Sequence, residues 1–232
     1  MSFHHEHNHF EINKMLHSPM TKIYIFQAIM TFIKSLIGIF VPVYLYKVGF
    51  SIAEILLYSM AIGLTYLILI PTSIKIIKKL GFKYTLLITI PIYFTHILVL
   101  NFLETSIIFY HLAWLSFGTY MAFFWPAMHS EIAMNGSSKH RASQMGTLQI
   151  LTTLFATLAP LVGGLVLEVS SYYVLLVISS IILFIGIIPL IVSKDIKLAS
   201  TFGIVASRIS LSLLVSQSTS TSVLVLIPSV WQ

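Results

Sequence analysis

Six long apolar runs, separated by short polar segments, constrain this 232-residue chain more than any other feature. They occupy approximately residues 23–46, 52–74, 84–103, 106–128, 144–168 and 172–193. Each run is close to the roughly 20 residues that an α-helix needs to cross about 30 Å of hydrocarbon. Helices are required there because backbone polar groups in lipid must be satisfied within their own segment, and the runs lack the alternating polarity of membrane β-barrel strands. We therefore predict an all-α membrane protein with six transmembrane helices.

The composition supports a lipid bilayer as the main contact of the outer surface. Hydrophobic residues make up 57% of the chain and charged residues 9%, whereas a typical soluble domain is roughly 25% charged. The net charge of +6 could indicate nucleic acid as a partner. However, the basic residues lie in short segments between apolar runs rather than on one folded basic face, so we expect no nucleic-acid binding.

The basic residues also predict the orientation. If the N-terminus is cytoplasmic, ten of them fall on the cytoplasmic side: Lys14, Lys22, Lys75, Lys78, Lys79, Lys83, Lys139, Arg141, Lys194 and Lys197. Lys47 falls in an outer loop. Cytoplasmic loops of membrane proteins are enriched in Lys and Arg. We therefore predict a multi-pass protein of the cell membrane with a cytoplasmic N-terminus.

The chain divides by composition into three segments. Residues 1–20 form a polar, histidine-rich tail, residues 21–195 the six-helix transmembrane domain, and residues 196–232 a serine-rich extension. Two interpretations of the extension stay open: an aberrant, out-of-frame sequence, or a native tail whose end dips into the membrane. The histidine tract at residues 4–9 carries metal-binding side chains, but it implies no fixed geometry, so we expect no resident metal.

Lys34 lies near the middle of the first apolar run. A cation at that depth costs about 2.5–3.5 kcal/mol on insertion scales, so it should face the bundle interior or an aqueous cavity. Gln27, Thr31, Lys34 and Gly38 share one helical stripe because they are four, three and four residues apart. The stripe indicates a cavity that meets an anionic or polar solute, a lysine paired with a buried carbonyl or carboxylate, or a helix placed so that the lysine amine reaches water.

A second stripe follows the fourth run, with His111, Trp114, Gly118, Ala122, Trp125 and His129 at helical spacing. Two histidines and two tryptophans are unusual on a face that contacts lipid, and their ring nitrogens need polar partners. Trp125 and His129 lie near the cytoplasmic end, where interfacial aromatic residues are expected in any case. We therefore choose His111, Trp114 and Gly118 as the candidates for the solute cavity.

Signatures of enzymes are missing from the predicted transmembrane domain. The sequence contains no G-x-x-x-x-G-K-[ST] and no G-x-S-x-G motif, and its H-E-x-x-H match, at residues 5–9, lies in the polar histidine-rich tail rather than on a predicted helix. Glu131 is predicted to lie in or beside a loop, so we expect no carboxylate within the membrane to support a proton relay. We expect neither an enzyme nor a cofactor.

The fifth run carries Ala159, Pro160, Gly163 and Gly164, which together resemble the G-P-x-x-G-G signature of major facilitator superfamily transporters, with Ala159 in place of the first glycine. The segment between runs two and three is similar to that family's loop motif at Lys79, Gly81 and Lys83, although Lys78 stands where the family has an acidic residue. Arg141 resembles the family's basic residue ahead of helix five. The chain thus resembles the N-terminal six-helix half of such a transporter.

The resemblance implies two inverted three-helix repeats, with the first and fourth helices lining a central cavity. It implies a secondary active transporter that moves small solutes, with or without a coupling ion, by alternating access. Only one half is present, so the expectation is a truncated or half-length chain that works as a homodimer or with a second six-helix half. The alternative is a membrane fragment or scaffold that transports nothing.

Overall fold

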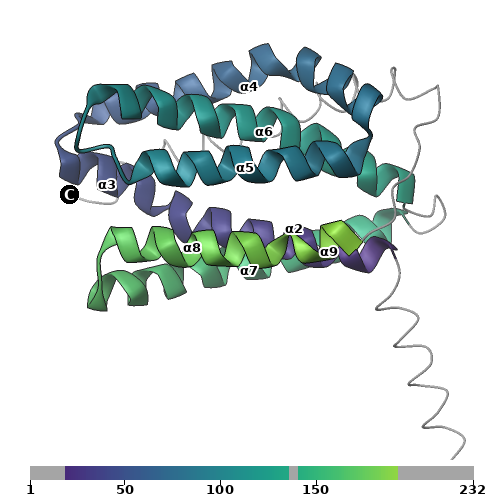
Figure 1. Cartoon of the computed structure of the whole chain (residues 1–232). Coiled ribbons are helices and arrows are strands. Elements are labelled where there is room, and N and C mark those ends of the chain that lie inside the picture. The colour runs from purple at the N-terminus through teal and green to yellow at the C-terminus, as the bar shows by residue number, and fades with distance from the viewer. Residues whose placement is uncertain (1–18, 136–140, 193–232) are drawn as a thin grey trace, which may run out of the picture.

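The computed structural model describes residues 19–135 and 141–192 (Figure 1). In this part of the chain the elements are α2 (Pro19–Gly38), α3 (Phe40–Val48), α4 (Ile52–Leu80), α5 (Phe82–Leu100), α6 (Ile107–Asn135), α7 (Arg141–Val169), α8 (Tyr172–Gly186) and α9 (Ile188–Val192). The predictions for the N-terminal tail, Lys139 and the serine-rich extension fall outside the described residues. Among those that are described, six stretches are long and apolar enough to cross a membrane. The predicted all-α, six-span architecture is confirmed.

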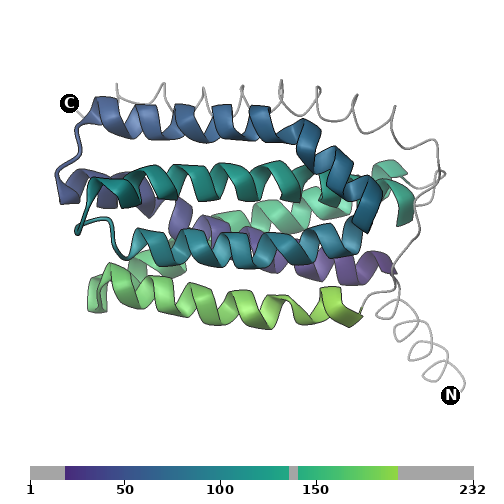
Figure 2. The ribbon, with the colours of Figure 1, turned by 45° about the horizontal axis from the view of Figure 1, so that its top comes forward.

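The helices form two layers of three spans (Figure 1). One layer contains α4, α5 and α6, and the other contains α2 with α3, α7, and α8 with α9. From a second direction the long helices lie side by side, with α4 and α8 at opposite margins (Figure 2). Within the layers, α6 packs against both α4 and α5, and α2 packs against both α7 and α8.

This packing has the internal symmetry of two repeats. If the first repeat is taken as the spans α2–α3, α4 and α5, and the second as α6, α7 and α8–α9, the first span of each repeat packs against the second and third spans of the other. When the two repeats are exchanged, the contact of α6 with α4 corresponds to that of α2 with α7, and the contact of α6 with α5 corresponds to that of α2 with α8. Such an arrangement is expected for inverted repeats related by a two-fold axis in the membrane plane.

The helices extend beyond the apolar runs that predicted them. Gly81, with a φ of +87°, is the single residue between α4 and α5, and its N–H donates to the carbonyl of Ile77 at 2.8 Å. The predicted loop from Lys75 to Lys83 is therefore mostly helix, with Lys78 and Lys79 in the last turn of α4. The prediction placed the end of this helix too early because it relied on polarity, whereas lysine is a good helix former and is favourable near a helix C-terminus.

Two spans are interrupted near a proline. Helix α2 ends at Gly38 and α3 begins at Phe40, and Pro42 has no N–H to donate to the carbonyl of Gly38. The last span breaks in the same way at Ile187, two residues before Pro189. Beyond that break, the Lys22 and Lys83 amines donate to carbonyls of α9, to Val192 at 3.1 Å and to Ile191 at 2.8 Å. These bonds fix the end of α9 to the starts of α2 and α5.

Candidate functional site: two cavities that share Lys34

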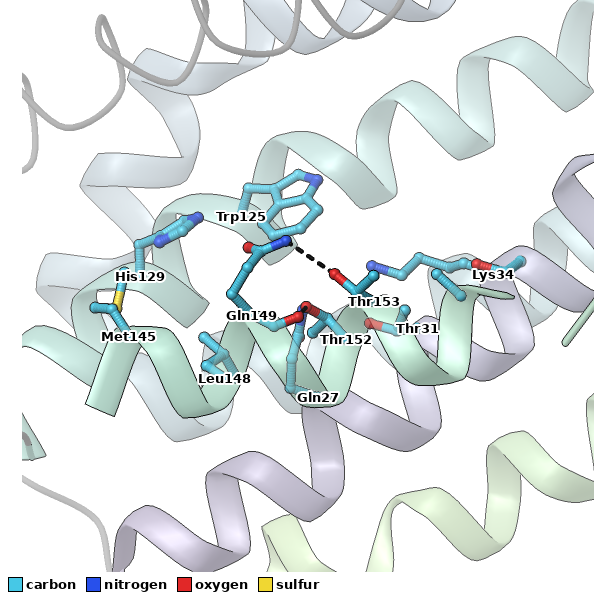
Figure 3. A pocket seen from close by; sticks show the side chains of 12 residues that line it. Gln27, Thr31, Lys34, Trp125, His129, Met145, Leu148, Gln149, Thr152 and Thr153 are labelled. Atoms are coloured by element: carbon cyan, nitrogen blue, oxygen red, sulfur yellow. Dashed lines mark hydrogen bonds between the residues drawn. The ribbon is translucent and has the colours of Figure 1, made fainter. Parts of the chain in front are cut away.

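A cavity of about 350 Å³ opens between α2, α6 and α7 (Figure 3). Its lining comprises Gln27, Thr31, Lys34 and Ser35 of α2, Trp125 and His129 of α6, and Met145, Leu148, Gln149, Thr152, Thr153 and Ala156 of α7. The volume lies within the range of roughly 300–1,000 Å³ that is typical of small-molecule sites. Helices from both repeats therefore build one ligand-sized space inside the bundle.

Lys34 is the central residue of this cavity. It lies 13 residues after Thr21 and 14 residues before Val48, the ends of the first span, and is thus at mid-depth. Its Nζ is 4.5 Å from the ring centroid of Phe124 and 4.6 Å from that of Trp125. Within residues 19–135 and 141–192, no carboxylate pairs with it. The alternative of a lysine neutralised by a buried acid has no support in this region.

The two aromatic contacts offset only part of the cost of placing the amine at mid-depth. Lys34 remains partly accessible, and a cation–π contact at such a site contributes about 0.5–1 kcal/mol. Two contacts therefore contribute about 1–2 kcal/mol, against an insertion cost of about 2.5–3.5 kcal/mol. The difference favours a lysine that also meets water or an anion in the cavity.

The cavity wall offers further polar groups. The Gln27 side chain is only 2% exposed, and its Oε1 has no hydrogen-bond partner among the described residues. On α7, the side-chain amide of Gln149 donates to Thr153 Oγ1 at 3.2 Å, and Thr152 Oγ1 donates to the Gln149 carbonyl at 3.0 Å. An unpaired polar atom in a membrane interior is costly. Gln27 Oε1 is thus a buried acceptor that has no partner among the described residues, and it belongs to a side chain of the cavity lining.

A second cavity of about 140 Å³ continues along α2 toward the α3 end. It shares Lys34 with the first cavity and is lined also by Gly38, Tyr58, Ser59, Tyr93 and His96, among others. The His96 side chain is buried, and its Nδ1 donates to the carbonyl of Ala113 at 3.1 Å. Lys34 therefore separates two spaces that follow each other across the bundle.

The predicted α2 stripe lines these spaces. Gln27, Thr31 and Lys34 border the larger cavity, and Gly38 joins Lys34 at the smaller one.

The three α6 candidates lie elsewhere. Trp114 Nε1 donates to His111 Nδ1 at 3.3 Å, and neither residue lines the two cavities described above. A Cβ at Gly118 would lie 2.6 Å from Thr65 Cβ, so this glycine is a packing position between α6 and α4. His111 and Trp114 thus contact each other rather than these cavities.

The glycine motif of α7 lies where α7 meets the break between α2 and α3. A Cβ on Gly163 would be 2.5 Å from Phe40 Cε2 and 3.0 Å from the Leu36 carbonyl oxygen. Ala159 is fully buried and Pro160 is half-buried, whereas a Cβ on Gly164 would meet nothing within 4 Å. Only Gly163 of the two glycines is therefore needed for close approach.

The residues of the predicted cytoplasmic motif lie at one end of the bundle. Lys79 lies in the last turn of α4, Gly81 connects α4 to α5, Lys83 bonds to α9, and Arg141 is the first residue of α7. This is the end at which α2 also begins (Figure 1).

Sequence reasoning missed several residues of the larger cavity. Trp125 and His129 were assigned to the membrane interface, and the α7 side of the cavity was not identified. A signal for the α7 side was present, since Met145, Gln149, Thr152 and Ala156 are four, three and four residues apart and thus share a helix face.

The expected position of Glu131 was wrong. Its side chain is only 3% exposed and lies within α6, because that helix continues to Asn135 beyond the apolar run. The described residues contain no cluster of three or more metal-binding side chains.

Comparison with known proteins gave one family match. A family model described as Major Facilitator Superfamily matches residues 23–228. The comparison with curated proteins gave no match.

Proposed function

The chain belongs to the major facilitator superfamily, and from this premise we propose that it is a secondary active transporter that moves small solutes by alternating access. The observation that carries the proposal is the ligand-sized cavity around Lys34 at the mid-depth of the first span. Transporters built from inverted repeats bind their solutes near the bilayer midplane, at the interface between repeats. An ionisable residue at that depth generally marks a solute or ion pathway.

The proposed solute cavity is bordered by the first span of each repeat, with Gln27, Thr31 and Lys34 on α2 and Trp125 on α6. The break after Gly38 lies about one helical turn from Lys34. Gly163 contacts Leu36 and Phe40, which lie within about two turns of Lys34. We propose that movement of α7 against this break accompanies the opening and closing of the cavity. His111 and Trp114 belong to the proposal only as residues that a solute would meet nearer the α3 end.

A second six-helix body is part of the proposal, supplied either by another copy of the chain or by a separate half. Polar side chains on α7, including Gln149, Thr153 and Thr157, are exposed in the single chain. In a lone six-helix body these groups would face lipid, which is unfavourable. A partner that covers them would also complete the wall of the cavity.

We further propose that the N-terminus is cytoplasmic and that the protein is in the cell membrane. The end of the bundle at which α2 begins carries five described lysines: Lys22, Lys75, Lys78, Lys79 and Lys83. The opposite end carries Lys47 together with Glu54, Glu104 and Glu168. This distribution follows the positive-inside rule.

Uptake by reconstituted vesicles tests the proposed function. The full chain is inserted into liposomes and offered a panel of radiolabelled sugars, organic acids, amines and amino acids. We expect saturable uptake of at least one solute, and its loss in Lys34→Ala at equal protein content. Lys47→Ala is the matched control, because Lys47 is an exposed lysine outside both cavities. A panel without any uptake favours the alternative of a membrane fragment that transports nothing, and undiminished uptake by Lys34→Ala contradicts the proposed role of the cavity.

A further inference from the structure

The charges on the cavity walls are unbalanced. Lys34 is the only Lys, Arg, Asp or Glu among the described residues that line the two cavities. The other ionisable side chains of the lining are His129 in the larger cavity and Tyr58, Tyr93 and His96 in the smaller one. The described lining therefore has one lysine amine and no acidic group opposite it.

The Lys34 amine has unused hydrogen-bonding capacity. An ammonium group has three N–H donors, yet its contacts in the described part of the chain are the faces of Phe124 and Trp125. A ring face attracts positive charge but does not replace an oxygen acceptor. The amine is thus held in place by aromatic contacts while its strongest possible partner, an anionic oxygen, is missing.

The surroundings of the amine favour a small anion with an apolar body. Figure 3 shows the Lys34 side chain directed along the cavity between Trp125 of α6 and the polar residues of α7. Thr153 and Gln149 provide hydroxyl and amide groups near the amine, whereas Leu148 and Met145, together with His129 of α6, line the part of the cavity nearer the start of α7 (Figure 3). One end of the cavity therefore suits a charged oxygen group and the other a short apolar chain.

We propose that the cavity binds a monocarboxylate, with the carboxylate on Lys34 and the apolar part of the solute beside Trp125 and Leu148. This inference rests on the proposed function, because it names the class of solute that the transporter moves. A phosphate group carries a charge of about −1.5 to −2 at neutral pH, which exceeds the charge that one lysine supplies to the described cavity lining. An amino acid would bring an ammonium group for which the described lining has no carboxylate.

Tryptophan fluorescence can test binding without transport. Trp114→Phe and Trp231→Phe leave Trp125 as the single tryptophan, because the chain has three. When a carboxylate draws the Lys34 amine away from the Trp125 ring, the emission of that ring should change. The full chain in detergent micelles is titrated with acetate, lactate, butyrate and benzoate, and separately with butyramide, alanine and inorganic phosphate.

We expect a saturable change with at least one carboxylate, and a response to butyramide, alanine and phosphate that is absent or far weaker. In Lys34→Gln the apparent affinity for the carboxylate should fall about 10- to 100-fold, the effect of losing a hydrogen bond to a charged group. Lys34→Arg keeps the charge and should retain most of the affinity, and Lys47→Gln should bind as the parent protein does. Size-exclusion chromatography of each variant shows whether it is folded and monodisperse.

Three results overturn the inference: no response to any of the four carboxylates, an equal response to butyramide or phosphate, or unchanged affinity in folded Lys34→Gln. Uptake of the best-bound carboxylate into proteoliposomes separates this inference from the proposed function. Binding without uptake supports the carboxylate site and contradicts transport. Uptake of an uncharged solute without carboxylate binding supports transport and overturns the carboxylate site.

Discussion

The contact of Gly163 with the break between α2 and α3 allows a matched test of the packing. Gly163 and Gly164 are neighbours in α7, and a substitution by alanine gives both the same gain in helix propensity, about 0.8–1 kcal/mol. Their surroundings differ. An added Cβ at Gly163 would be 2.5 Å from Phe40 Cε2 and 3.0 Å from the Leu36 carbonyl oxygen, whereas at Gly164 it would meet nothing within 4 Å.

The difference between the two variants isolates the steric term. Inserting an extra methyl group into a well-packed interior costs typically about 1–3 kcal/mol. The propensity gain of about 1 kcal/mol cancels in the comparison, so Gly164→Ala should exceed Gly163→Ala in free energy of unfolding by about 1–3 kcal/mol. Against the parent protein, Gly164→Ala should be neutral or stabilised, and Gly163→Ala should be neutral to destabilised by about 2 kcal/mol.

Reversible unfolding of the purified chain by sodium dodecyl sulfate in mixed micelles, followed by circular dichroism, measures this difference. The backbone oxygen of Leu36 cannot rotate away, so relief of the clash requires α7 to move from α2. Equal stability of the two variants would refute the close approach of α7 to the helix break, and with it the packing of the first span against the fifth.

Three further predictions concern other positions. Lys34→Leu removes the cost of a cation at mid-depth, about 2.5–3.5 kcal/mol, and loses cation–π contacts of about 1–2 kcal/mol. The same assay should therefore show a free energy of unfolding that is higher by about 0.5–2.5 kcal/mol. A lower free energy of unfolding would mean that the lysine has a structural partner. Gly118→Ala should be less stable than Gly146→Ala by about 1–3 kcal/mol, because an added Cβ at Gly118 lies 2.6 Å from Thr65 Cβ and one at Gly146 meets nothing within 4 Å; equal unfolding curves would argue against the α4–α6 contact. The chain has no cysteine, so a maleimide reacts only with a cysteine that is introduced. On intact cells an impermeant maleimide should label Glu104→Cys, and it should label Lys79→Cys only after permeabilisation. The reverse pattern would contradict the proposed orientation.

The six spans could be predicted from the sequence because the length and apolarity of each run directly reflect the thickness of the bilayer. The α2 stripe was predictable for a similar reason, since a lysine between apolar turns has few environments that it can occupy. Helix ends were predicted less well. The α4–α5 connection at Gly81 depends on backbone conformation, and a polarity pattern alone does not distinguish a loop from the exposed end of a helix.

The depth of the α6 residues shows a second limit. Helix α6 runs antiparallel to α2, so its residues at the level of Lys34 come late in the span, and Phe124 and Trp125 lie there. His111 is 14 residues earlier than Trp125, or about 21 Å along the helix axis at 1.5 Å per residue. The spacing of residues along one helix shows which of them share a face. It does not show at which depth in the membrane a neighbouring helix places its side chains. The contribution of α7 was missed because packing between distant spans has no local signal.

The exchange of partners between the repeats has a consequence for synthesis of the protein. Helix α2 packs against α7, whose last residue, Val169, is 131 positions beyond Gly38 (169 − 38 = 131). At about 5–20 residues per second, the ribosome needs about 7–26 s to make that stretch. During this interval the newly inserted first span carries Lys34 in the bilayer before α7, the helix against which it packs, has been translated. Insertion factors that shelter polar side chains should therefore contact α2 until the fifth span arrives.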